Sequence, residues 1–411
     1  MPEDDGSSLV RTTRWLAKRF GTYYSTVKLH LPPRYTRREW AFMYFDKSFM
    51  IRHLGFERRS QIQDYLRKEV PRHAYYSTAY YEEPGARTMN EKGWQGATLV
   101  FDLDADHLEG AHEMEYGQML AAVKDEFVKL VDRWLIGKLG FDVRDVGIAF
   151  SGGRGYHAHI EDPRVLELNA FERREVVDLV TGKADISDFL EKEAFHAGMR
   201  QDGRGYSRHT LRMPDPSRGD WKGDLTQETL ALFQDLDSMH AQGREDEAVA
   251  RLATLAEVEE DEAREVLQML VDGDPGNRRI DRMVTDLRID LREGIGERFW
   301  ERIAGNLFVT MAGEADEPVT ADTKRLIRLP TSLHGKTGFR VVELNRDQLE
   351  TFDPLVDALA FGDDPVEVEG LVDDTFSLGG TEHTVTAERR TALPEYAAVF
   401  ACLRGMAQIP A

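Results

Sequence analysis

The stretch FDLDADH, residues 101–107, follows the apolar run of residues 97–100 and places three aspartates two residues apart. Residues two apart on a strand share a face, so Asp102 and Asp104 are predicted to project together. Neighbouring carboxylates repel each other, and hard divalent cations such as Mg²⁺ or Mn²⁺ are their natural partners. The stretch therefore predicts a buried strand that ends in a metal site. The alternative is a strand that ends in a turn, with Asp106 capping the helix that follows.

The composition predicts a soluble chain with room for more than one domain. At 411 residues and 41% hydrophobic content, it can build two or three domains with real cores. No stretch approaches the roughly 20 apolar residues that a membrane span needs, and the acidic start MPEDDGSS does not resemble a secretion signal. The single cysteine, Cys402, excludes an internal disulfide and a cysteine-based zinc site. We therefore expect a cytoplasmic protein with no membrane partner.

The charge balance indicates a halophile. The net charge is −21, and Arg outnumbers Lys by roughly three to one. In molar salt the Debye length falls to about 3 Å, so self-repulsion is screened while the carboxylates keep the surface hydrated. The alternative is an ordinary acidic protein. Such acidity alone argues against a nucleic-acid partner, but in a halophile the positions of the remaining arginines decide that question.

The pattern of apolar residues predicts an α/β chain of the α+β type, with small mixed sheets flanked by helices. Alternating aromatic runs within residues 38–56 predict a hairpin around a turn at residues 46–48. Further elements are expected as strands at residues 97–104, 146–150 and 156–160, a helix at 113–138, and strand-like and loop segments within 308–344.

The chain is predicted to fold as a core interrupted by an insertion. Residues 1–222 form the first part of the core. Residues 223–290 are strongly helical and acidic, so they form a helical insertion or small domain. Residues 291–411 complete the core and end in a packed helix at residues 395–406.

A second motif, SGGRGYHAHI at residues 151–160, has the composition of an anion-binding connection between two strands. Its glycines let backbone amides approach an anion closely, and Arg154 adds a charged fork that suits phosphate oxygens. His157 and His159 would share one face of the outgoing strand. The alternative is an ordinary hairpin with a solvated arginine.

A third segment, residues 316–344, forms a basic patch in an otherwise acidic chain. Its GKT sequence does not form a P-loop, because the glycine required five residues before Gly335 is replaced by Pro330. The alternative is a positively charged surface loop. The basic side chains of the patch are Lys324, Arg325, Arg328, His334, Lys336 and Arg340.

Together, FDLDAD, SGGRGYH and RLIRLPTSLHGKTG, in this order and at these separations, resemble the catalytic (small) subunit of archaeal and eukaryotic DNA primases. The resemblance extends from residue 38 to about residue 344. With the acidic composition, it indicates a haloarchaeal source. It implies a primase-polymerase catalytic core.

The resemblance also implies a set of catalytic carboxylates. The family's carboxylate pair falls on Asp102 and Asp104, and its third carboxylate falls on Asp316. Asp322 is the competing candidate for the third position, but its spacing to the following motif does not match. These three aspartates would hold two Mg²⁺ or Mn²⁺ ions for nucleotidyl transfer.

The remaining family residues bind the nucleotide. In the family, this role belongs to the serine, glycine, arginine and histidine of the second motif and to the arginine and histidine of the third. The matching residues are Ser151, Gly153, Arg154, His157, Arg328 and His334. Arg52, on the second strand of the early hairpin, matches a family arginine near the same site.

The resemblance implies synthesis of RNA and DNA primers from NTPs and dNTPs on a single-stranded DNA template, with a primase large subunit as partner. Many relatives carry a cysteine-rich zinc knuckle where this chain has HLEGAHEMEYGQ, residues 107–118. His107 and His112 have no familiar zinc spacing, so no structural zinc is predicted. The arginine-rich run at residues 200–223 is a candidate for tracking the template backbone, and the alternative there is a solvated loop.

Three other functions fit parts of the pattern. The first is a primase-polymerase of the same superfamily that works in repair or end joining. The second is a glycosyltransferase with an Asp-X-Asp motif, which would bind a sugar nucleotide without a template. The third is a non-catalytic replication scaffold, which would not need the three aspartates.

Overall fold

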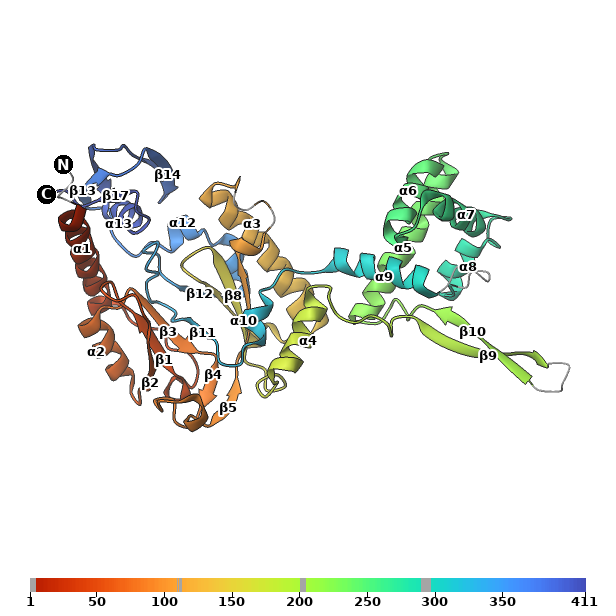
Figure 1. Cartoon of the computed structure of the whole chain (residues 1–411), viewed down its shortest axis with the longest axis horizontal. Helices are drawn as coiled ribbons and strands as arrows, with labels where there is room; N and C mark the ends of the chain where they lie inside the picture. Colours follow the sequence, from red (N-terminus) through yellow and green to blue (C-terminus); the bar gives the residue numbers. More distant parts are fainter. Residues whose placement is uncertain (1–4, 109, 111–112, 200–204, 290–296) are drawn as a thin grey trace. The chain divides into compact units, whose positions relative to one another are not determined.

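The computed structural model describes residues 5–108, 110, 113–199, 205–289 and 297–411. The chain forms two compact units: Met1–Val177 with Glu314–Ala411, called unit 1 here, and Asp178–Gly313, called unit 2 (Figure 1). Each is described separately. None of the helices in the described ranges is long and apolar enough to cross a membrane.

The first sheet of unit 1 has the strand order β11-β3-β1-β2. The hairpin expected within residues 38–56 is confirmed, since β1 and β2 pair antiparallel. The sheet's strands are β1 (Trp40–Met43), β2 (Ile51–Leu54), β3 (His73–Ser77) and β11 (Leu326–Arg328). Helices α1 (Asp5–Thr26) and α2 (Arg59–Glu69) contact each other. Leu16, Phe20 and Tyr24 recur every four residues on α1 and are all buried, so α1 packs through one stripe.

The second sheet of unit 1 carries the aspartate stretch and has the order β12-β7-β8-β6. Its strands are β6 (Leu99–Asp104), β7 (Val146–Phe150), β8 (Gly155–Ile160) and β12 (Val342–Leu344). Leu99, Phe101 and Leu103 are fully buried on one face of β6. The helix expected at residues 113–138 begins as α3 (Tyr116–Lys129) and continues as a π-helical segment, Leu130–Lys138. It covers the sheet, and Phe127 stacks on Tyr156 at 5.3 Å between ring centroids.

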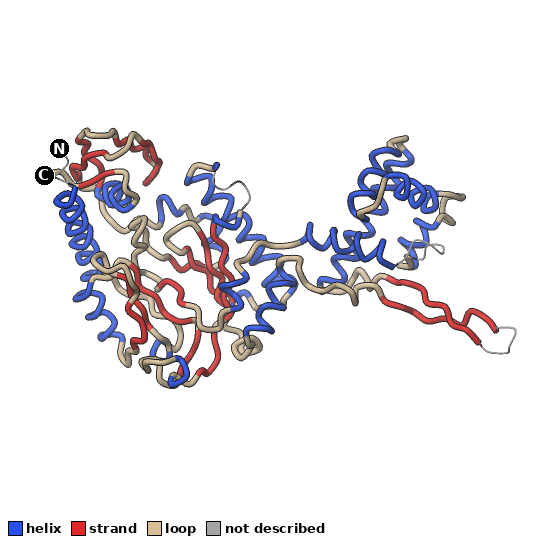
Figure 2. The backbone as a smooth tube through the Cα atoms, viewed as in Figure 1, coloured by secondary structure: helices blue, strands red, loops and turns tan. Residues whose placement is uncertain are grey.

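The C-terminal part of unit 1 contains strands that the sequence analysis did not predict. A small sheet has the order β16-β13-β17, and β14 pairs with β15 (Figure 2). The expected helix at residues 395–406 is α13 (Glu395–Leu403). The chain end lies beside α1, where Arg11 Nε donates to the carbonyl of Ile409 at 2.9 Å. The strands are β13 (Pro365–Gly370), β14 (Asp374–Leu378), β15 (Thr381–Val385), β16 (Arg390–Pro394) and β17 (Ala407–Gln408).

Short elements complete unit 1, and the residues of α4 are divided between unit 1 and unit 2. These elements are β4 (Ala79–Tyr81), β5 (Trp94–Ala97), α4 (Ala170–Val180), α10 (Glu317–Ala321), α11 (Arg346–Thr351) and α12 (Pro354–Asp357). The α+β class is confirmed. The named strand pairings are antiparallel, whereas mixed sheets were expected.

Unit 2 consists of a long β-hairpin and a group of helices. The predicted insertion at residues 223–290 lies inside this unit, which also includes the hairpin before it and α9 after it. Residues 308–311, expected in a strand-like or loop segment, belong to α9 because Phe308 and Met311 are buried on its apolar face. The elements are β9 (Glu191–Met199), β10 (Gly205–Arg212), α5 (Trp221–Ala241), α6 (Glu245–Ala256), α7 (Glu260–Val271), α8 (Arg279–Asp286) and α9 (Glu297–Met311).

Candidate active site

The register between β6 and β8 positions the first carboxylate. Asp102 lies opposite His157, and His157 Nε2 is 3.2 Å from Asp102 Oδ1. Burial alone would raise the pKa of Asp102, but His157 and the nearby Arg328 and Arg325 hold that pKa below its ordinary value. Asp102 is therefore kept ionised at the end of a buried strand.

The second carboxylate, Asp104, begins the turn after β6. It accepts a hydrogen bond from the backbone N–H of Asp106 and lies 3.5 Å from Arg154 Nε. Asp106 is not the cap of the following turn; Asp104 caps that turn, residues Ala105–His107, and Asp106 forms an ion pair with Arg154. The aspartates of this stretch thus differ in role, and Arg154 of the second motif contacts two of them.

Asp316 is brought to the same strand although it is more than 200 residues away in sequence. Its backbone N–H donates to the carbonyl of Asp102 at 2.9 Å, and it is the N-cap residue of α10, which packs on β6. Asp322 follows the other end of α10, where its carboxylate accepts a hydrogen bond from the backbone N–H of Lys324. This placement favours Asp316 over Asp322 as the third carboxylate.

A cavity of about 500 Å³ lies beside Asp104 and is lined mainly by cationic and polar groups. Five of the predicted nucleotide-binding residues line it: Ser151, Gly153, Arg154, Arg328 and His334. His157 is not among the lining residues and instead contacts Asp102. Arg52 is also absent from the lining, because its Nε donates to the buried carboxylate of Glu39 at 3.0 Å.

The glycines of the second motif are required by close backbone contacts. Gly152 has φ +78°, a conformation that favours glycine. A Cβ on Gly155 would lie 2.4 Å from the carbonyl oxygen of Leu103, inside the β6–β8 pairing. The hydroxyl of Tyr116 donates to the carbonyl of Gly153 at 2.7 Å and fixes the other side of the loop. The sequence therefore specifies both a tight loop and its contact with the aspartate strand.

The third motif is tied directly to the second. The hydroxyl of Thr337 donates to the carbonyl of Gly152 at 2.6 Å and lies 3.1 Å from Nδ1 of His334. Thr337 therefore serves as a structural link between the motifs, in agreement with the rejection of a P-loop at Gly335. Both motifs contribute to the lining of the cavity, with Ser151, Gly153 and Arg154 from the second motif and His334, Lys336 and Thr337 from the third.

The cavity has the electrostatics of an anion site. Burial lowers the pKa of His334 well below its ordinary value, and Arg328, His73, Lys336 and Arg154 lower it further. His334 is therefore neutral. The positive potential that helps to lower the pKa of His334 also favours a bound polyphosphate.

The lining also includes residues that were not predicted to bind nucleotide, among them Lys336, Arg404 and Tyr116. Lys336 was visible in the sequence as part of the basic patch. Arg404 follows α13 and belongs to no motif, so only the fold reveals it. Its guanidinium carbon lies 5.1 Å from the ring centroid of Tyr116 and 5.4 Å from that of Phe400, which orients the side chain by cation–π contacts.

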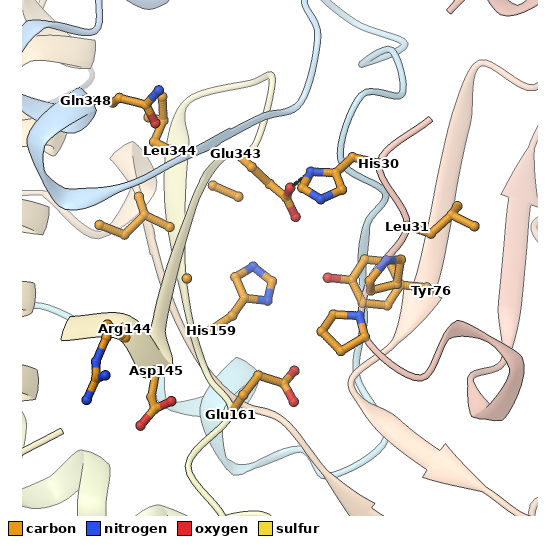
Figure 3. Close-up of a pocket in the computed structure, with 15 residues that line it drawn as sticks. His30, Leu31, Tyr76, Arg144, Asp145, His159, Glu161, Glu343, Leu344 and Gln348 are labelled. Carbon is orange, nitrogen blue, oxygen red and sulfur yellow. Dashed lines mark ion pairs between the residues drawn. The ribbon is translucent and has the colours of Figure 1, made fainter. Parts of the chain in front are cut away.

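A larger cavity, about 700 Å³, lies elsewhere on unit 1 and is not lined by the three aspartates. Figure 3 shows His159, Tyr76 and Glu161 pointing into it. His159 shares a face of β8 with His157, as expected, but burial lowers its pKa to about 3, so it is neutral. This cavity is not lined by Asp102, Asp104 or Asp316, and it lacks the cluster of cations that surrounds the cavity beside Asp104.

The carboxylates fit a divalent cation by their chemistry. Asp102 and Asp104 offer hard oxygen donors on one face of β6, and Asp316 adjoins them through its backbone. Within the part of the chain that the structure describes, no three His, Cys, Asp or Glu side chains form a ready-made metal cluster. Asp102 instead contacts His157, and Asp104 contacts Arg154. In the segment considered for zinc, residues 107–118, residues 109, 111 and 112 and the side chain of His107 lie outside the described part of the chain.

A carboxylate strand beside a cation-lined cavity is the arrangement of a nucleotidyltransferase that binds a nucleoside triphosphate. Residues 101–346 match the model of the DNA primase small subunit family. The chain is 40% identical to the DNA primase small subunit PriS of Methanothrix thermoacetophila, over 97% of this chain and 99% of the relative. It is 38% identical to that of Halobacterium salinarum, over 97% and 98%.

The chain belongs to the DNA primase small subunit family. It is the catalytic subunit, a nucleotidyltransferase that synthesises primers for DNA replication. The resemblance found in the sequence is confirmed, and the relative from Halobacterium salinarum fits the halophilic composition. Membership excludes the glycosyltransferase and the non-catalytic scaffold as alternatives. Nucleotidyl transfer in this family depends on metal ions in general.

The contact between Gly155 and Leu103 can be tested by stability. We expect Gly155→Ala to lower the free energy of unfolding by about 1–3 kcal/mol, because the new methyl group must displace the backbone of β6. Gly147→Ala on the neighbouring strand is the matched control, since its Cβ would lie 3.7 Å from the nearest atoms, which belong to His159. Denaturant unfolding measures both. Equal effects of the two changes would contradict the account of the motif.

Proposed function

We propose that Asp102, Asp104 and Asp316 hold two divalent cations, Mg²⁺ or Mn²⁺, and that the cavity beside Asp104 holds the triphosphate of the incoming nucleotide. The observation that carries this proposal is the cavity itself, in which Asp104 and five of the predicted nucleotide-binding residues meet. When bound, the two cations would activate a 3′-hydroxyl and stabilise the leaving pyrophosphate.

The side chains of the cavity bind and align the triphosphate. Arg154 and Arg328 neutralise phosphate oxygens, and Lys336 adds a point charge at the same wall. Ser151 and Gly153 line the cavity, with the backbone N–H of Gly153 donating to Ser151 Oγ at 3.3 Å, and neutral His334 offers a ring nitrogen. Fixed donors of this kind hold the reacting phosphorus in line for attack without reorganisation at the moment of reaction.

His157 acts on Asp102 in this proposal. The ring is buried, and its Nε2 is 3.2 Å from Asp102 Oδ1, so it fixes the direction of the carboxylate. Arg154 holds Asp104 in a comparable way, at 3.5 Å. These two contacts keep a pair of like charges side by side until a cation and the nucleotide take over the neutralisation.

The substrates and partners follow from the family. We propose that the chain uses NTPs and dNTPs on a single-stranded DNA template and works as a heterodimer with the primase large subunit. Unit 1 is the catalytic core in this proposal, because it contains all three aspartates and the cavity. Unit 2, Asp178–Gly313, contains the proposed insertion at residues 223–290.

The aspartate assignment predicts a sharp difference within FDLDADH. Asp104→Asn should lower kcat for primer synthesis on the order of 10²-fold or more, because a main electrostatic contact to the transition state is lost. Asp106→Asn is the matched control, since Asp106 is exposed and contacts Arg154 without joining the proposed ligands. Single-turnover kinetics with saturating nucleotide measure both. Equal kcat values for the two variants would contradict the assignment.

The cavity predicts a nucleotide-binding role for Arg404, which lies outside every sequence motif. Arg404→Ala should raise the KM for NTP on the order of 10-fold with little change in kcat, as expected for the loss of a charge-assisted hydrogen bond. Arg390→Ala is the control, because Arg390 pairs with Glu367 and does not line the cavity. An unchanged KM in Arg404→Ala would remove Arg404 from the site.

A further inference from the structure

In the arginine-rich run at residues 200–223, the structure describes the side chains of two arginines, Arg212 and Arg218. Arg218 forms an ion pair with Asp220 at 2.7 Å, and residues 200–204 lie outside the described part of the chain. Arg212, at the end of β10, forms an isolated backbone bridge with Arg288. This bridge places the end of β10 beside the segment that follows α8.

Arginines in unit 2 are commonly neutralised by carboxylates of the same unit. Arg278, for example, contacts Asp237 at 2.6 Å and Asp281 at 2.8 Å. Six arginines of unit 2 have a carboxylate oxygen within 4.0 Å: Arg218, Arg244, Arg251, Arg264, Arg278 and Arg302. Pairing is the expected state in a chain of net charge −21.

Three arginines differ from these and lie together. Arg279, Arg282 and Arg288 line a cavity of about 240 Å³, with Met283 and Asp286 as the other lining residues. Among the described residues, none of the three arginines has a carboxylate within the 4.0 Å that defines an ion pair. Three arginines and one aspartate give the lining of this cavity a net positive charge. Among the described residues, Asp286 forms no ion pair with any of the three arginines.

The fold holds these arginines in place. Ile280 and Met283 are buried, and α8 packs against α5 and α7, which fixes the orientation of the helix. Arg279 and Arg282 are three residues apart, so they project from the same side of α8. Arg282 and Arg288 are exposed. Like charges held side by side repel each other, and an anion that bridges them removes this cost.

We propose that Arg279, Arg282 and Arg288 form a binding site for the phosphodiester backbone of the single-stranded template. Guanidinium forks match phosphate oxygens, and backbone contacts of this kind bind without regard to base sequence. The site lies in unit 2 and is separate from the proposed triphosphate cavity of unit 1. Because both units belong to one chain, a template held by unit 2 stays at high effective concentration for unit 1.

The test measures binding of a fluorescent oligothymidylate to the full chain across a series of KCl concentrations at which the protein stays folded. Arg282→Gln with Arg288→Gln removes two exposed charges. We expect weaker binding, and the slope of log K against log salt should become shallower by about 1.4, because each contact to a single strand contributes about 0.7. The KM for NTP should not change.

Arg244→Gln with Arg251→Gln is the matched control, because it changes the net charge of unit 2 equally but removes paired arginines. This control should bind the oligonucleotide with the slope of the unmodified chain. A shallower slope in the control, or an unchanged slope in the Arg282/Arg288 variant, would overturn the proposal. So would loss of large-subunit binding with unchanged oligonucleotide binding, which would assign the arginines to a protein partner. A failed triphosphate assignment would appear instead as an unchanged nucleotide KM in Arg154→Ala.

Discussion

The antiparallel pairing of β6 with β8 is the constraint on which the rest of the site depends. It places Asp102 opposite His157 and Asp104 opposite Gly155. The strand that carries the carboxylates therefore pairs directly with the strand that follows the glycine-rich loop of the second motif. The absence of a side chain at Gly155 lets the two strands approach, since a Cβ there would lie 2.4 Å from the carbonyl of Leu103. The register of one strand pair thus brings proposed metal ligands and phosphate ligands together.

Distant parts of the chain complete the site around this strand pair. Asp316 joins the carbonyl of Asp102 through its backbone, Thr337 joins the carbonyl of Gly152, and Arg404 enters from the C-terminal segment. The motifs supply the reactive groups, and the segments between and after them supply the walls.

The sequence was most informative where residue chemistry and local geometry coincide. Alternation around Asp102 predicted a strand with carboxylates on one face, and glycines around Arg154 predicted a tight connection. Arg404 could not be predicted, because nothing near it in sequence signals an anion and its position depends on the packing of α13 against Tyr116. The roles of His157 and Arg52 also depend on partners far away, Asp102 and Glu39, which no local pattern specifies. Arg279, Arg282 and Arg288 differ from paired arginines such as Arg278 in having no ion pair among the described residues, and composition cannot show this difference.

The most direct test of the account is a crystal structure of the chain with Mn²⁺ and a non-hydrolysable nucleoside triphosphate, with the metal located by anomalous scattering. The account predicts Mn²⁺ at Asp102, Asp104 and Asp316, and the triphosphate against Arg154, Arg328 and Lys336. Metal and triphosphate bound instead in the larger cavity at His159 and Glu161 (Figure 3) would contradict it.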